Sequence, residues 1–165
     1  MAKPKSKDPI KRESTRLTCV ATTGGQTTNK SEFWKKIITD IMGSKIEAEG
    51  FVRPLGGLVD PEKVRMATWS ASSLAEMNQA LSLNSALSII SEDDPSIFMT
   101  YGIDPSAKPP SDRERLCGWI IHHVNIGIAL KEKTDALKLE AHLKYLGSEL
   151  KIPSEEEFLV DKLLN

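Results

Sequence analysis

The clearest pattern of apolar and polar positions in the chain is an amphipathic segment over residues 31–42. Its large apolar side chains recur three and four positions apart, and polar side chains fill the opposite face. Ser31 is a suitable N-cap and Gly43 a suitable C-cap. The pattern therefore predicts a helix whose apolar face consists of Phe33, Trp34, Ile37, Ile38, Ile41 and Met42.

Helical signals continue through the middle of the chain. Asp60-Pro61-Glu62 combines an N-cap, a proline at the first helical position and an acidic first turn, so a helix is expected to start there. The helical pattern breaks among nearby serines and resumes over residues 74–90. Asp94-Pro95 predicts a short helix that Gly102 ends.

The last third of the chain continues this pattern. One long helix is predicted from Asp112 onward, with Trp119 among the most buried side chains, and another over about 134–146. The capping box from Ser154 to Glu157 predicts a short terminal helix. Since only one or two short strand candidates stand out, chiefly Leu17–Thr22, the expected fold class is all-α, with a compact body of five to seven helices.

Composition and charge divide the chain into three parts. With 165 residues and 39% apolar side chains, it can form one core. Residues 1–16 hold six basic and two acidic side chains, a net charge of +4 that leaves −5 on the remainder. We therefore expect a flexible basic arm and hinge over 1–29, a helical body over 30–152 and a C-terminal interaction helix over 153–165.

The basic arm is the segment with the most functional content. Flexible cationic arms bind phosphates through counterion release, without reading bases. We therefore expect the arm, helped by two arginines of the body, to bind nucleic acid, RNA rather than DNA; a solubilising tail is the alternative. The predicted nucleic-acid-binding residues are Lys3, Lys5, Lys7, Lys11, Arg12, Arg16, Arg113 and Arg115.

The terminal helix is too short to be stable alone, so its apolar face must pack on something. Packing on its own body is one possibility, and packing on a second copy of the chain is the other. The second possibility predicts a homo-oligomer with a subunit interface made by Phe158, Leu159, Leu163 and Leu164.

Local motifs for catalysis, metals or cofactors are missing from the sequence. His122 and His123 are adjacent, so on one helix their rings point about 100° apart and cannot share a metal ion. Gly24-Gly25-Gln26 lacks the lysine and spacing of a phosphate-binding loop. Cys19 and Cys117 have no zinc-ligand spacing and are expected to be reduced thiols. We therefore expect no metal, no cofactor and no enzymatic activity.

The layout of basic arm, helical body and apolar tail is similar to that of small viral coat and nucleocapsid proteins with helical assemblies. This resemblance in layout implies a non-enzymatic, self-associating protein that coats or packages nucleic acid. One alternative is a protein-binding adaptor or regulatory module, in which Lys35, Lys36 and the C-terminal helix form a partner surface. The other is a small enzyme whose site includes His122 or Cys117. The longest apolar run is too short for a bilayer, so a cytoplasmic or virion location without membrane contact is expected.

Overall fold

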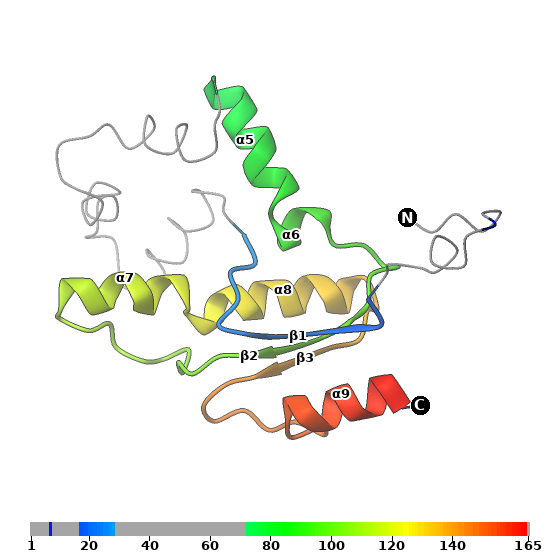
Figure 1. The fold of residues 1–165 in the computed structure, drawn as a ribbon. Helices are drawn as coiled ribbons and strands as arrows, with labels where there is room; N and C mark the ends of the chain where they lie inside the picture. The colour runs from blue at the N-terminus through cyan, green and yellow to red at the C-terminus, as the bar shows by residue number, and fades with distance from the viewer. Residues whose placement is uncertain (1–6, 8–16, 29–71, 165) are drawn as a thin grey trace.

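The computed structural model describes residue 7, residues 17–28 and residues 72–164. Within these residues the chain alternates strands and helices (Figure 1). The elements are β1 (Cys19–Thr23), α5 (Leu74–Leu83), α6 (Ala86–Ile89), β2 (Ser96–Thr100), α7 (Arg113–Ile121), α8 (Val124–Ala136), β3 (Ala141–Lys144) and α9 (Glu155–Leu164). The helix predicted over residues 31–42 and the helix start at Asp60 lie outside the described residues.

The three strands form one parallel sheet in the order β1-β2-β3. Cys19 lies opposite Ser96 in the first pair, and Ile97 lies opposite Ala141 in the second. Helix α8 covers one face of this sheet and α9 the other (Figure 1). The prediction of an all-α body is therefore wrong, because the chain is a mixed α/β protein with a parallel sheet at its centre.

Strand β2 is the segment that was predicted as a short helix after Asp94-Pro95. Ile97 and Met99 face the core beneath α8, and Phe98 packs on the other face against Phe158 of α9. A strand that is buried on both faces has a continuous apolar run, which periodicity alone does not distinguish from a buried helix. Asp94 closes a turn instead of capping a helix, since its carboxylate accepts a hydrogen bond from the Ser91 N–H at 2.8 Å.

Strand β3 lies in the segment predicted as a helix over 134–146. Helix α8 ends before it, because Lys138 adopts a left-handed conformation with φ of 57° and the Leu139 N–H bonds back to the Thr134 carbonyl at 2.9 Å. Ala141 and Leu143 then face the α8 side of the sheet, and His142 faces α9.

The long helix predicted from Asp112 is divided into α7 and α8 at the two histidines. His123 has an extended backbone and is the N-cap of α8, where its Nδ1 accepts a hydrogen bond from the Asn125 N–H at 3.2 Å. Trp119 is only partly buried on α7, with its ring centroid 4.5 Å from that of His123. The prediction that Trp119 is among the most buried side chains is wrong, because the core is built by α8 and the strands.

Part of the predicted arm-and-hinge segment also belongs to the sheet. Cys19–Thr23 pairs along its whole length with β2, and Thr27 and Thr28 are buried just after it. Thr27 Oγ1 donates to the Ile126 carbonyl at 3.0 Å, and its own carbonyl accepts from the Leu87 N–H at 3.0 Å. The division into 1–29, 30–152 and 153–165 stays a prediction for the arm itself, but residues 19–28 pack as part of the body.

Candidate functional site

The carboxyl edge of the sheet brings together polar groups that are far apart in the sequence. In open parallel sheets, ligands bind outside the carboxyl ends of the strands, because the loops that follow the strands meet there. Here residues 24–28 follow β1, residues 101–112 follow β2, and the first turn of α8 lies at the same edge (Figure 1). This edge is the candidate functional site.

The turn after β1 requires glycine at two consecutive positions. Gly24 has φ of +58°, and a Cβ there would lie 3.1 Å from Nδ1 of His122. A Cβ on Gly25 would lie 2.6 Å from Oγ1 of Thr22. The Gly24 N–H bonds to the Thr100 carbonyl at 2.7 Å, so the turn extends the pairing of β1 with β2 by one residue. The glycine pair therefore shapes a tight turn on which side chains of other elements lie.

Tyr101 holds this turn from the end of β2. Its hydroxyl donates to the Gly25 carbonyl at 2.6 Å, across 76 residues of sequence. Burial raises the pKa of Tyr101 to about 12, so the hydroxyl stays protonated and keeps its donor role. Its ring passes over Gly127 of α8, where any larger side chain would collide with it. Sequence reasoning missed Tyr101, because no local motif marks a residue that acts through a distant turn.

His122 lies on the outside of the same turn. Its Nδ1 is 2.7 Å from the Gly24 carbonyl oxygen, and since a carbonyl only accepts, Nδ1 carries the proton. The neutral ring therefore has its lone pair on Nε2, and the side chain is exposed. An exposed imidazole fixed by a backbone carbonyl can accept a proton, or donate a charged hydrogen bond from Nε2 once it is protonated.

His123 is fully buried next to it and has the opposite tautomer. Because Nδ1 accepts from the Asn125 N–H, the proton of the neutral ring is on Nε2. Nε2 is buried and has no hydrogen-bond partner within the described ranges. Burial lowers the pKa of His123, and the charge of Asp104 partly opposes this effect. His123 thus offers a neutral N–H donor that needs an acceptor.

Asp104 is the acidic group of this edge. Its carboxylate accepts hydrogen bonds from the backbone N–H of Ser106 at 2.7 Å and from the Ser106 hydroxyl, and these bonds lower the pKa of Asp104. A Cβ at Gly147, after β3, would lie 3.9 Å from its Oδ2. The loop after β2 therefore holds an ionised carboxylate between His123 and the end of β3.

The predicted nucleic-acid-binding residues are only partly within the described structure. Lys7 is exposed, and the other basic residues of the arm lie outside the described residues. Arg113 and Arg115 lie on α7, which projects beyond the carboxyl edge and leads directly into His122 (Figure 1). The Arg115 side chain is 82% exposed and forms a loose pair with Asp112 at 3.6 Å. The two arginines therefore lie on the helix that leads to the histidines, nine and seven residues before His122. Leu17, which directly follows the arm in sequence, lines the groove at the opposite, amino edge.

The four predicted interface residues on α9 divide into two groups. Phe158 is fully buried on this chain's own sheet, with its ring centroid 5.5 Å from Phe98 and 5.6 Å from His142. Leu159 is half-buried, whereas Leu163 and Leu164 are 63% and 77% exposed. The N-cap predicted at Ser154 is confirmed, because the Glu157 N–H bonds to Oγ of Ser154 at 3.1 Å.

A charged cluster fastens α9 to the sheet next to Phe158. Glu140 accepts hydrogen bonds from Lys162 at 2.8 Å, from Ser96 at 3.0 Å and from the His142 ring at 3.0 Å. Burial alone would raise the pKa of Glu140, but these three partners lower it to about 2. The carboxylate therefore stabilises the folded state at any pH at which it is ionised.

This cluster predicts a loss of stability in acid. Because the folded pKa of Glu140 lies below its unfolded value of 4.5, its contribution is complete above about pH 4.5 and is lost as the pH falls toward 2. We expect Glu140→Gln to lower the melting temperature at pH 7 and to make it less sensitive to pH between 4.5 and 2. Thermal melts of both proteins at several pH values test this; parallel curves would contradict it.

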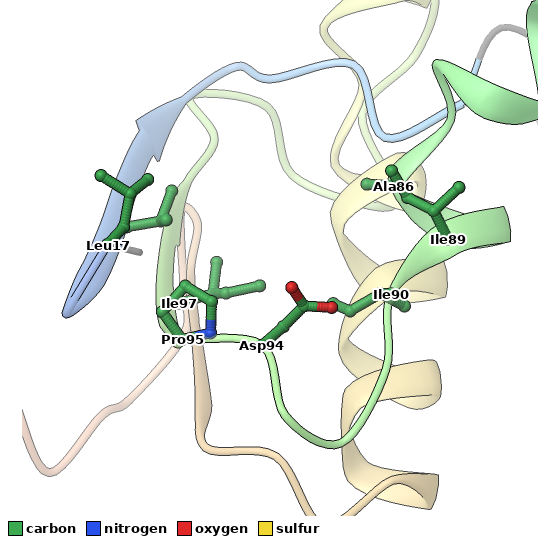
Figure 2. Close-up of a pocket in the computed structure, with 8 residues that line it drawn as sticks. Leu17, Ala86, Ile89, Ile90, Asp94, Pro95 and Ile97 are labelled. Atoms are coloured by element: carbon green, nitrogen blue, oxygen red, sulfur yellow. The ribbon is translucent and has the colours of Figure 1, made fainter. Parts of the chain in front are cut away.

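The amino edge of the sheet carries a separate, apolar groove between β1 and α6 (Figure 2). Its volume is about 340 Å³, and it is lined mainly by Leu17, Val20, Ile89, Ile90 and Ile97. Two of these side chains are strongly exposed, Leu17 at 66% and Ile89 at 56%. The groove was not predicted from the sequence, because β1 and α6 are far apart in the chain and come together only when it folds.

No group of three or more histidine, cysteine, aspartate or glutamate side chains is placed to hold a metal ion in the described part of the chain. Among the described helices, none combines the length and apolar character needed to cross a membrane.

Comparison with protein-family models, with curated proteins and with solved structures gives no match to this chain.

Proposed function

We propose that this protein is a non-enzymatic nucleic-acid-binding protein that contacts phosphates with the carboxyl edge of its sheet as well as with its basic arm. The observation that carries this proposal is the buried Nε2–H of His123, a donor without a partner among the described residues. Leaving a buried donor unpaired costs about 1–3 kcal/mol, so an acceptor that reaches it is favoured. A phosphate oxygen is such an acceptor, and because Nε2 is buried it can be reached only if neighbouring side chains move aside.

The surroundings of His123 support a phosphate more than a neutral acceptor. Exposed His122 lies next to it and becomes a second donor from Nε2 when protonated. Two cationic residues, Arg113 and Arg115, belong to helix α7, which ends just before these histidines. Asp104 opposes an anion, but its carboxylate is already engaged by Ser106. The net charge of the body is negative, so the interaction needs these local cations and is expected to weaken steeply with salt.

Self-association remains part of this proposal. The exposed apolar positions of α9 are Val160, Leu163 and Leu164, which lie three and four residues apart and so share one stripe. Large exposed apolar side chains on one helix face favour contact with another surface. A homo-oligomer would carry several arms, and their combined binding would exceed that of one arm through multivalency. RNA remains the proposed nucleic acid.

The test is binding of fluorescent oligonucleotides, measured by anisotropy at several salt concentrations. We expect a single-stranded RNA to bind at low salt, and Arg115→Gln to reduce the slope of log affinity against log salt by about 0.7, the value for one phosphate contact on a single strand. His122→Ala should weaken binding. Lys133→Gln is the matched control, because Lys133 is exposed in the last turn of α8, at the other edge.

The outcomes separate the parts of the proposal. If Arg115→Gln and His122→Ala bind like the unmodified protein, the carboxyl edge is not the phosphate site. If no RNA binds even at low salt, the nucleic-acid proposal fails as a whole, and the adaptor alternative replaces it. Lys35 and Lys36, on which that alternative relies, lie outside the described residues. A mononucleotide shows whether a single phosphate is enough for binding. A DNA duplex as long as the RNA shows whether a longer strand is bound.

A second candidate function has one observation in its favour. The side chain of His122 is arranged as a general base would be: the Gly24 carbonyl fixes Nδ1, and the exposed Nε2 carries the lone pair that would accept a proton. The binding assay also tests this candidate if the RNA is examined on a gel afterwards. Intact RNA supports a binding protein, whereas cleavage that is lost in His122→Ala favours a small enzyme.

A further inference from the structure

The apolar groove at the amino edge has room for a side chain but offers it no polar contact. Asp94 is the only polar side chain that lines it, and its carboxylate already accepts hydrogen bonds from the backbone N–H of Ser91 at 2.8 Å and from its hydroxyl at 3.0 Å. The other lining side chains are apolar, and they come from β1, α6, β2 and the residues next to these elements (Figure 2). The groove therefore suits an aliphatic side chain rather than a polar ligand.

The surface around the groove is strongly acidic. Glu92 and Asp93 are exposed on the turn that leads from α6 to β2, directly before Asp94. Over residues 86–97, which run from α6 into β2, the sequence has three acidic side chains and no lysine, arginine or histidine. An occupant with basic residues next to an aliphatic one thus has the complementary charge.

The chain contains such an occupant immediately before the groove. Residues 8–16 end at Leu17, which itself lines the groove. In this segment Ile10 is the only aliphatic side chain larger than proline, and Lys11 and Arg12 follow it directly. Ile10 lies seven positions before Leu17, and an extended chain of that length reaches up to about 25 Å, enough to fold back.

We propose that residues 8–16 of the arm dock in this groove, with Ile10 on its aliphatic floor and Lys11 and Arg12 facing the acidic turn. The docked arm cannot bind phosphates with these cations, so nucleic acid and the groove compete for it. This inference rests on the proposed function, because the competition has a consequence only if the arm binds nucleic acid. The tether gives the arm of the same chain a higher effective concentration at the groove than that of a second copy.

The contact is built to be reversible. Exposed ion pairs are individually weak and are screened by salt, and only one aliphatic side chain is available as an anchor. A polyanion that engages several basic residues at once is therefore able to displace the arm. Docking thus acts as a threshold: short or sparse phosphate ligands leave the arm on the groove, and long strands release it.

Isoleucine methyl NMR spectra of the full chain test the docking directly. Ile89, Ile90 and Ile97 report on the groove. We expect the double variant Lys11→Glu and Arg12→Glu to shift these resonances, and saturation of the unmodified protein with RNA to shift them in the same direction. The control is Lys3→Glu with Lys5→Glu, which makes the same charge change outside the docking segment and should leave them in place. Unchanged resonances in the first variant, or a shift that depends on protein concentration, would overturn docking within one chain.

Binding affinity tests the competition. We expect Glu92→Gln with Asp93→Asn to bind single-stranded RNA roughly threefold to tenfold more tightly at low salt, because the arm loses its competing partner. Glu132→Gln with Glu149→Gln removes the same charge from exposed positions elsewhere and should gain much less. Equal gains in both variants would overturn the inference. If the unmodified protein binds no RNA, the proposed function fails, and the comparison of methyl spectra still decides whether the arm docks.

Discussion

Phe158→Ala should unfold in urea far more easily than the unmodified protein, with a loss of about 3–5 kcal/mol in the free energy of unfolding, the usual range for a large buried aromatic side chain. Phe158 is fully buried, and its ring lies against Phe98 and His142 on the face of the sheet that α9 covers. Removing it leaves a cavity between α9 and the sheet. Such a loss is a large part of the roughly 5–15 kcal/mol that stabilises a typical domain.

Leu163→Ala is the matched control on the same helix. Leu163 is strongly exposed, so its truncation should change the free energy of unfolding of the monomer by less than about 0.5 kcal/mol. Similar losses in the two variants would show that α9 does not pack as described. A loss for Leu163→Ala that grows with protein concentration would instead indicate that the exposed stripe is buried in an oligomer.

Gly127→Ala should cost about 2–3 kcal/mol, at the upper end of the usual range for overpacking a core. A Cβ at this position of α8 would collide with the Tyr101 ring and lie 2.8 Å from Cδ1 of Leu143. Both neighbours are buried in the core cluster, so neither can move without displacing others. Moving the Tyr101 ring also endangers the bond from its hydroxyl to the Gly25 carbonyl, so the turn after β1 should become less protected in hydrogen exchange.

Gly118→Ala provides the comparison for this substitution. Gly118 lies within α7, and a Cβ there would meet nothing within 4 Å. Alanine is favoured over glycine inside a helix by about 0.5–1 kcal/mol, so this variant should be slightly more stable than the unmodified protein. If neither glycine variant changed the free energy of unfolding, the result would contradict the close packing of Tyr101 on α8.

Much of the helical structure could be predicted from the sequence, because its signals are local. The Ser154 N-cap marks the start of α9, and the spaced apolar residues over 74–90 become α5 and α6. The strands could not be recognised in the same way. Ser96–Thr100 is too short and too uniformly apolar to show a period, and Ala141–Lys144 alternates over only four residues. Their partners lie far away in the sequence, so no local pattern identifies the pairing.

The candidate site was hidden for a related reason. The adjacent histidines were judged on the assumption of one continuous helix, on which their rings point in different directions. The backbone breaks between α7 and α8 instead, so His123 caps a helix while His122 reaches the Gly24 turn. Gly24-Gly25 was predicted to lie in a flexible hinge, whereas the structure shows a turn whose carbonyl groups are held by Tyr101 and His122. The parallel pairing of β1 with β2 brings Tyr101 near this turn.

The parallel sheet also has a consequence for how the chain folds during synthesis. Neither pair of strands is a hairpin, and the bond that fixes the turn after β1 joins residues 76 positions apart. At 5–20 residues per second, the ribosome needs about 4–15 seconds after making Gly25 before Tyr101 exists to hold it. Closing such long loops is intrinsically slow, so β1 must wait unpaired in the meantime. We therefore expect the nascent chain to be most prone to misfolding and to chaperone binding during this interval.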